Sequence, residues 1–118
     1  MSEANKMARV SEIKFLVQLD ENNIPLQIQW QATDSQHNEL KECKSIMVSV
    51  WDGKEKDTMR IDLWTKDMRI DEMHAHFLQT LMTQAESFYQ ATKHESILKD
   101  MKAFCEKFIQ SSEFLRTP

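Results

Sequence analysis

The sequence predicts an α+β fold: a small antiparallel β-sheet, in the chain order β-β-α-β-α-α, with helices packed on one of its faces. Apolar and polar residues alternate in three short segments, which is typical of half-buried strands, and apolar residues recur every three or four positions in longer segments. The chain has one glycine and two prolines among its 118 residues. An all-β fold needs more turn-forming residues than this, so helices are expected to make up much of the chain.

The first two strands are predicted to form a hairpin. Apolar residues occupy every second position from 13 to 19 and again from 28 to 32. Residues 20–25 between them contain Asp, Asn and Pro, which favour a tight turn. Trp30 falls on the apolar side, where we expect it to lie in the core. The other side carries a row of glutamines (Gln27, Gln29 and Gln31).

Residues 38–51 fit either a helix or a strand. Their apolar residues recur at helical spacing, as at Cys43 and Met47, but residues 46–50 also alternate as a strand would. Possible helix N-caps precede the segment (Thr33, Asp34 and Ser35). Gly53 follows it, where a helix C-cap would be left-handed. These flanking residues favour the helix, and the strand remains the alternative.

A third strand is predicted at residues 58–64, where apolar and polar residues alternate again. A long helix is predicted to follow it from about Ile70, with Asp71 and Glu72 in its first turn, where carboxylates stabilise the helix dipole. A break near residues 92–95 separates this helix from a last one. The apolar stripes of the two helices are Ile70, Met73, Phe77, Leu81, Ala85 and Phe88, and then Leu98, Met101, Cys105, Phe108 and Ile109.

The length of the chain fits one domain, predicted at residues 10–118 after a flexible polar tail at residues 1–9. The net charge of −4 and the pI near 5.5 predict no nucleic acid partner. Neither a secretory signal nor a run of about 18 apolar residues is present in the sequence, so we expect a cytoplasmic protein without membrane insertion. Cys43 and Cys105 are expected to be reduced and buried.

The residues that could carry chemistry predict no enzyme. His74 and His76 stand two apart on the predicted helix and point about 200° apart, so they are not expected to share a metal ion. Asp62 and Asp67 could form an acid–base pair, but each is better explained by its place on an outer face or in a turn. The sequence contains no recognisable nucleophile or phosphate-binding motif. We therefore predict no catalytic residue, no metal and no cofactor.

A candidate contact surface is predicted around Trp64. Alternation turns Arg60, Asp62 and Trp64 to the side opposite the apolar residues of their strand. Trp and Arg are enriched in binding hot spots, so this face is predicted to contact a partner protein or a second copy of the chain. Leu16 and Gln29 are expected to share the same side. In the alternative, Trp64 is merely covered by the N-terminal tail or by a homodimer contact.

The run R-I-D-L-W-T-K-D-M at residues 60–68, followed by I-D-E-M at residues 70–73, resembles the gliding motility protein family GldC. Residues 11–15, 19–22 and 48–52 resemble the same family in the same order, although Arg69 stands where many members have a proline.

This resemblance implies a small accessory protein, without catalytic residues, that is associated with the gliding of Bacteroidetes-like bacteria. A protein partner from a motility assembly is therefore expected, and a homo-oligomer is possible. The alternatives are a small-molecule-binding or enzymatic domain with a pocket between the sheet and the helices, and a holdase-like chaperone that uses Met and aromatic surface.

Overall fold

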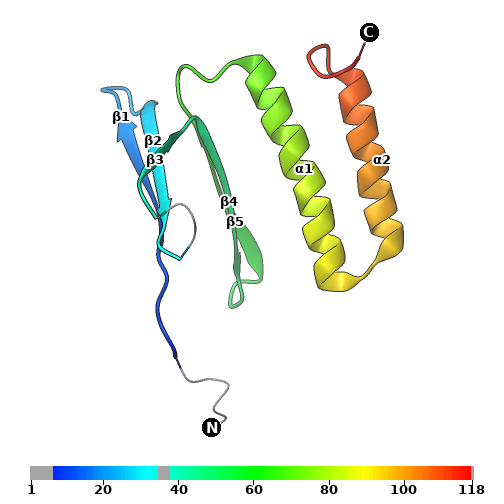
Figure 1. Cartoon of the computed structure of the whole chain (residues 1–118), viewed down its shortest axis with the longest axis horizontal. Helices are drawn as coiled ribbons and strands as arrows, with labels where there is room; N and C mark the ends of the chain where they lie inside the picture. Colours follow the sequence, from blue (N-terminus) through cyan, green and yellow to red (C-terminus); the bar gives the residue numbers. More distant parts are fainter. Residues whose placement is uncertain (1–6, 35–37, 118) are drawn as a thin grey trace. The chain divides into compact units, whose positions relative to one another are not determined.

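The computed structural model describes residues 7–34 and 38–117, so most of the predicted N-terminal tail (residues 1–9) lies outside the described residues. Within these ranges, five strands precede two helices (Figure 1). They are β1 (Ile13–Leu19), β2 (Pro25–Ala32), β3 (Lys41–Cys43), β4 (Ser45–Asp52), β5 (Asp57–Trp64), α1 (Ile70–Thr92) and α2 (Glu95–Ser111). The chain divides into two compact units: residues 1–68 contain these strands, and residues 69–118 contain both helices.

The predicted α+β class is confirmed, but the predicted order of elements is wrong. The chain reads β-β-β-β-β-α-α, and its strands form two small antiparallel sheets instead of one. The helix predicted within residues 38–51 is replaced by β3 and β4.

In the first sheet, the strands lie in the order β1-β2-β3. The predicted hairpin is confirmed: Phe15 lies opposite Trp30, and Val17 lies opposite Ile28. Ile28 is fully buried and is also opposite Cys43 of β3, so these residues share the apolar face of the sheet. Trp30 is half-buried there.

The second sheet consists of β4 and β5 alone. Its register explains why residues 46–50 form a strand. Ile46, Val48 and Val50 lie opposite Leu63, Ile61 and Met59, in that order. We call these six residues the aliphatic ladder. In this register the apolar side chains of both strands pack against each other as three cross-strand pairs on one face. A helix would have scattered the β-branched side chains around its surface.

The residues that favoured a helix at 38–51 have other roles. The Thr33 hydroxyl accepts a hydrogen bond from the Glu12 N–H at 3.0 Å, and the Thr33 N–H donates to the Glu12 carbonyl at 3.0 Å, which closes the open end of the first hairpin. Ser35 lies outside the described residues. Gly53 lies in the turn between β4 and β5, where Lys56 is the residue with a left-handed backbone.

The two sheets are linked by Thr65, Lys66 and Asp67, which we call the joint. The Thr65 N–H donates to the Lys44 carbonyl at 2.8 Å, so Thr65 extends the pairing of β5 to the point where β3 and β4 meet. The Lys66 N–H donates to the Pro25 carbonyl of β2 at 3.2 Å. The ammonium of the Lys66 side chain lies 2.5 Å from Asp20 Oδ2. Thr65 is buried. The joint therefore fastens the end of β5 to the start of β2.

The second unit is an antiparallel pair of helices. The predicted break is confirmed: Lys93 adopts a left-handed backbone with φ 57°, and the ring of His94 accepts the Ile97 N–H at the start of α2. Arg69 precedes α1 in an extended conformation, and its N–H donates to Glu72 Oε1 at 3.0 Å. This hydrogen bond would be lost with a proline at that position. Neither described helix is long and apolar enough to cross a membrane.

Both cysteines are free thiols. Cys105 is buried between the helices, as predicted. Cys43 is only half-buried, because it lies in the short strand β3 and not on a helical stripe. Partial burial still raises the pKa of the Cys43 thiol, which keeps it protonated and poorly nucleophilic at neutral pH.

Candidate protein-binding surface

The face of β4 and β5 opposite the aliphatic ladder carries the predicted contact residues. We call it the tryptophan face. It is formed by Ser45, Met47, Ser49 and Trp51 of β4 and by Thr58, Arg60, Asp62 and Trp64 of β5. The side chains share this face because directly opposed residues in an antiparallel pair point the same way.

Two tryptophans stand towards the two ends of this face. The Trp64 side chain is 52% exposed, and it points away from Met59, Ile61 and Leu63, as the alternation predicted. Trp51 is 64% exposed and lies opposite Thr58. The sequence prediction missed Trp51, because residues 38–51 were assigned to a helix. The alternation of residues 48–51 was the signal that could have found it.

Between the tryptophans, the Arg60 guanidinium is held in place from two sides. Its Nη2 and Nε lie 2.6 and 3.3 Å from the two carboxylate oxygens of Asp62. Its Nη1 donates to the Ser49 hydroxyl across the strand pair. Both charged side chains are about 40% exposed, so the pair contributes at most about 1 kcal/mol to stability. Its main effect is to fix the orientation of a planar cation on the surface.

The other two predicted contact residues lie elsewhere. Leu16 and Gln29 are cross-strand partners in the three-stranded sheet, whereas Arg60, Asp62 and Trp64 belong to the two-stranded one. Leu16 is 45% exposed. The structure therefore brings three of the five predicted residues together and divides the predicted single sheet between two.

The aliphatic ladder changes from buried to exposed along its length. Ile46, nearest the joint, is 9% exposed, whereas Val50, Met59 and Ile61 are 53–62% exposed. The outer half of the β4–β5 hairpin thus presents large apolar side chains on both of its faces.

The acidic residues considered for catalysis have structural partners. Asp62 pairs with Arg60 as described, and Asp67 Oδ1 accepts the Thr65 hydroxyl at 2.6 Å. That hydrogen bond lowers the pKa of Asp67 and keeps the carboxylate charged. At the other end of the joint, the Lys66 ammonium and nearby N–H groups hold the pKa of Asp20 at about 2. Asp67 in the joint and Asp20, which is paired with it through Lys66, therefore act as fixed acceptors.

His74 also has structural surroundings. His74 Nδ1 lies 2.8 Å from the hydroxyl of buried Ser112, and its ring packs edge-on against Phe108 and Phe114. His74 thus anchors the turn that follows α2. Among the described residues, no three His, Cys, Asp or Glu side chains come close enough to hold a metal ion.

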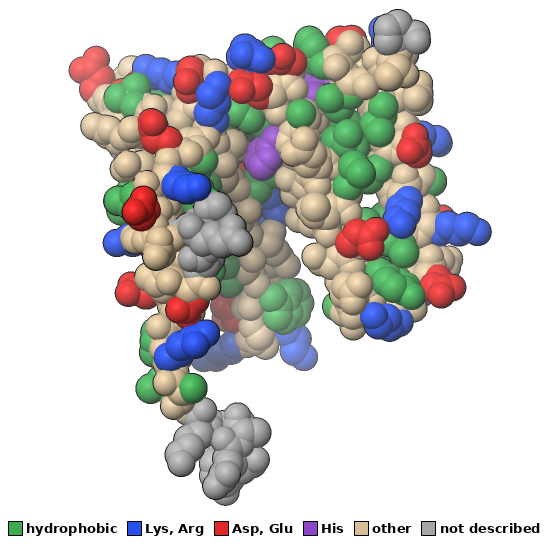
Figure 2. All heavy atoms as spheres, viewed as in Figure 1, with side chains coloured by type: hydrophobic (Ala, Val, Ile, Leu, Met, Phe, Trp, Pro, Cys, Tyr) green, Lys and Arg blue, Asp and Glu red, His purple; other side chains and the backbone are tan. Residues whose placement is uncertain are grey.

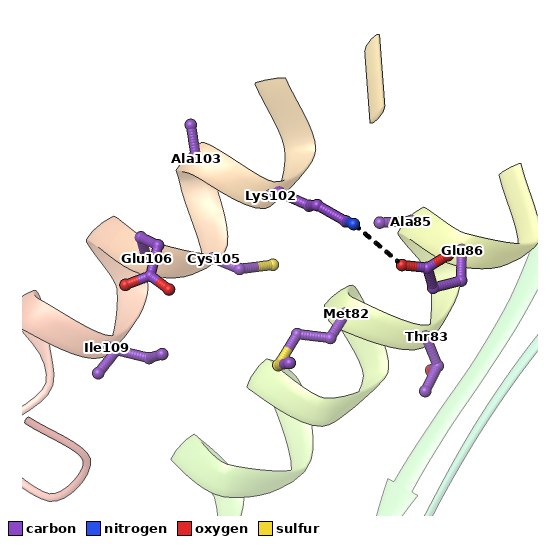
Figure 3. A pocket seen from close by; sticks show the side chains of 9 residues that line it. All are labelled: Met82, Thr83, Ala85, Glu86, Lys102, Ala103, Cys105, Glu106 and Ile109. Atoms are coloured by element: carbon purple, nitrogen blue, oxygen red, sulfur yellow. Dashed lines mark ion pairs between the residues drawn. The ribbon is translucent and has the colours of Figure 1, made fainter. Parts of the chain in front are cut away.

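A groove of about 600 Å³ runs between α1 and α2 (Figure 3). Met82 and Cys105 point into it, and Lys102 and Glu86 form an ion pair of 3.3 Å across it. Figure 2 shows the hydrophobic side chains lying between the helices, with charged side chains around them. The remaining lining residues are Thr83, Ala85, Ala103, Glu106 and Ile109. Because Lys102 and Glu86 neutralise each other, few polar groups are left to orient a small ligand.

Comparison with protein families gives a match that covers most of the chain. The model of the family described as "Gliding motility-associated protein GldC-like" matches residues 25–114, which is 90 of the 118 residues. The matched segment runs from the start of β2 to the turn after α2, and it includes the tryptophan face and the joint. Comparison with curated proteins and with solved structures gives no significant match.

Proposed function

The chain belongs to the family of gliding motility-associated GldC-like proteins, and from this premise we propose that it is a non-enzymatic accessory protein that binds another protein of a motility-associated assembly. The observation that carries the proposal is the tryptophan face. Two half-exposed tryptophans flank a guanidinium that is already held in one orientation. Trp and Arg dominate binding hot spots, and an ordered side chain loses little entropy when a partner docks.

The shape of this face favours a protein over a small molecule as the partner. The tryptophan face lies on an open two-stranded ribbon, and residues 58–64 span about 20 Å at 3.3 Å per residue. Small ligands are usually enclosed in a concave site, whereas a surface of this length fits another chain. The groove between the helices supports the alternative of a small-molecule-binding domain, but its lining is mostly apolar and its one ion pair is internal.

We propose that the protein acts in the cytoplasm and needs no cofactor. Asp67, one of the two acidic residues considered for catalysis, accepts the Thr65 hydroxyl within the joint, which supports a binding role more than a chemical one. A holdase-like chaperone would use the exposed aliphatic ladder instead, and would bind unfolded chains without regard to Trp51 or Trp64.

The experiment is affinity capture from the native organism, with the tagged chain as bait. Trp51→Ala, Trp64→Ala and the double variant are compared with the unchanged chain, and Leu26→Ala serves as a matched control because Leu26 is 49% exposed on the other sheet. We expect the partner to be captured by the unchanged chain and the control, and each tryptophan variant to bind it at least about tenfold more weakly. A binding assay with the purified partner measures this difference.

Equal capture by all variants would contradict the proposal. Retention of unfolded model substrates by every variant would instead favour the holdase alternative. Subcellular fractionation of the native organism tests the proposed cytoplasmic location, and recovery of the protein with the membrane or outside the cell would refute it.

A further inference from the structure

The outer edge of β5 is a row of backbone groups without a paired strand. Because the Thr65 N–H points towards Lys44, and successive N–H groups alternate along a strand, the odd-numbered residues of β5 bond to β4. The N–H and C=O groups of Arg60 and Asp62 therefore point away from it. So does the C=O of Thr58, whereas the Thr58 N–H donates to Asp57 Oδ1 at 2.9 Å. In the part of the chain that the structure describes, β4 and β5 form a sheet of their own, so these groups meet no strand.

The sequence of β5 is self-complementary about Ile61. Met59 and Leu63, both apolar, stand two residues to either side, and Arg60 and Asp62, of opposite charge, stand one residue to either side. An antiparallel copy of the strand centred on Ile61 would therefore place Arg60 opposite the partner's Asp62. Met59 would lie opposite the partner's Leu63, and Ile61 opposite the partner's Ile61.

We propose that a second copy of this chain pairs with the first along β5, edge to edge and antiparallel about Ile61. The inference goes beyond the proposed function, because its occupant is the chain itself and not the motility partner. The pairing would join two hairpins into one four-stranded sheet with two-fold symmetry. It leaves both tryptophan faces open, on the same side of the joined sheet.

Backbone geometry and side-chain charge select the same register. Arg60 and the partner's Asp62 both have outward N–H and C=O groups, so they can exchange two hydrogen bonds. Sliding by two residues would bring Arg60 opposite the partner's Arg60, or Asp62 opposite the partner's Asp62. Such like charges destabilise a strand pair. Sliding by one residue would put the aliphatic ladder of one copy on the tryptophan side of the other.

The exposed half of the aliphatic ladder supplies a reason for the pairing. A two-stranded sheet is marginally stable in water and gains stability from further strands. Ile61 and Met59 are 55% and 62% exposed, and each would gain an apolar neighbour across the new strand pair. Arg60 and Asp62, already paired within the strand, would join their counterparts in a group of four alternating charges.

The first test uses charge reversal and the purified chain alone. Sedimentation analysis is expected to show a concentration-dependent dimer. Arg60→Asp and Asp62→Arg should each weaken dimerisation at least about tenfold, because each puts like charges opposite one another. An equimolar mixture of the two variants should restore a dimer, since Asp at 60 then faces Arg at 62 in the other chain. Lys99→Asp, a matched charge reversal on α2, should leave the dimer unchanged.

The mixture distinguishes pairing between chains from the Arg60–Asp62 ion pair within one chain. Mixing the two variants cannot restore the ion pair within a chain, so a restored dimer must come from contacts between chains. Circular dichroism confirms that each variant is folded. A chain that stays monomeric up to about 1 mM, or a dimer that neither variant weakens, would overturn the proposal. Partner capture is measured separately, so this failure would leave the proposed function standing.

The second test measures the register. Ile61→Cys would face the partner's Cys at a closely spaced position and should form a dimer that reducing agent separates. Met59→Cys is the matched control, because its counterpart lies about four residues away along the partner strand and should not be bridged. The unchanged chain controls for Cys43 and Cys105. Equal cross-linking at positions 59 and 61 would overturn the proposed pairing.

Discussion

At the scale of single residues, Trp30 and Trp64 have different expected roles. Trp30 is half-buried on the apolar face of the first sheet, opposite Phe15 and beside the fully buried Ile28. Trp64 is 52% exposed beside the Arg60–Asp62 pair. We therefore expect Trp30 to stabilise the fold, whereas Trp64 is available for contact with a partner.

We expect Trp30→Ala to lower the free energy of unfolding by about 3 kcal/mol, because it leaves a cavity next to Ile28. Trp64→Ala should lower it by about 1 kcal/mol or less, because half of the side chain is already in water. Urea unfolding followed by circular dichroism measures both, at a protein concentration low enough to keep the chain monomeric. Equal losses would mean that Trp64 belongs to the core and that the tryptophan face is not a free surface.

At the scale of elements, β5 and the helices could be predicted from the sequence, but β3 and β4 could not. Residues 58–64 alternate without ambiguity, and the apolar stripes at residues 70–111 admit only helices. Residues 46–50 carry both periodicities, and the choice between them depends on Leu63, Ile61 and Met59. Those partners lie 9 to 17 residues further along the chain, so the pattern within residues 46–50 does not by itself decide between helix and strand. Trp51 was missed as a contact residue because the helical spacing and the flanking caps were favoured over the alternation of residues 48–51.

The joint predicts how stability depends on pH. The pKa of Asp20 is held at about 2 in the folded chain, below the ordinary value of 3.8, because Lys66 and backbone N–H groups favour its charged form. A carboxylate whose pKa is lowered by folding stabilises the fold above its unfolded pKa. This contribution should therefore be complete above about pH 4 and lost as the pH falls towards 2.

Unfolding experiments between pH 2 and pH 6 measure this effect, and Asp20→Asn is the variant that removes it. We expect the free energy of unfolding of the unchanged chain to fall more steeply with acid than that of Asp20→Asn. Asp34→Asn is a matched control, since Asp34 is also acidic and pairs with Arg9 outside the joint. If the curves of the unchanged chain and Asp20→Asn run parallel, the Lys66–Asp20 contact does not hold the sheets together.

At the scale of the whole molecule, burial is concentrated at a few points. The fully or nearly fully buried apolar residues of the strands are Ile28 and Ile46, and those of the helices are Ala85 and Cys105. The alternation and the helical spacing of apolar residues predicted the α+β class, but the division of the strands into two sheets depends on where β3 ends and β4 begins, at Lys44. Nothing in the sequence marks Lys44, because the change of partner there is made by the distant Thr65.

Hydrogen exchange should follow this uneven burial. Amides near the joint, such as that of Thr65, should exchange slowest, because they are bonded within buried surroundings. Amides at the outer end of the β4–β5 hairpin should exchange fastest in the dilute chain. Exchange measured by NMR residue by residue tests the gradient. Equal protection of the odd-numbered amides along β5 at low concentration would contradict it.

The joint also bears on the order in which the chain acquires its structure. Each hairpin is closed by residues near in sequence, such as Asp52, whose Oδ1 accepts the N–H groups of Lys54 and Glu55 in the turn. The Lys66 to Pro25 hydrogen bond instead joins positions 41 residues apart, 66 minus 25, so it closes a long loop and has a larger entropic cost. We therefore expect the hairpins to be the early folding units and the joint to form last. Changes at Lys66 would then act mainly on how fast the chain unfolds.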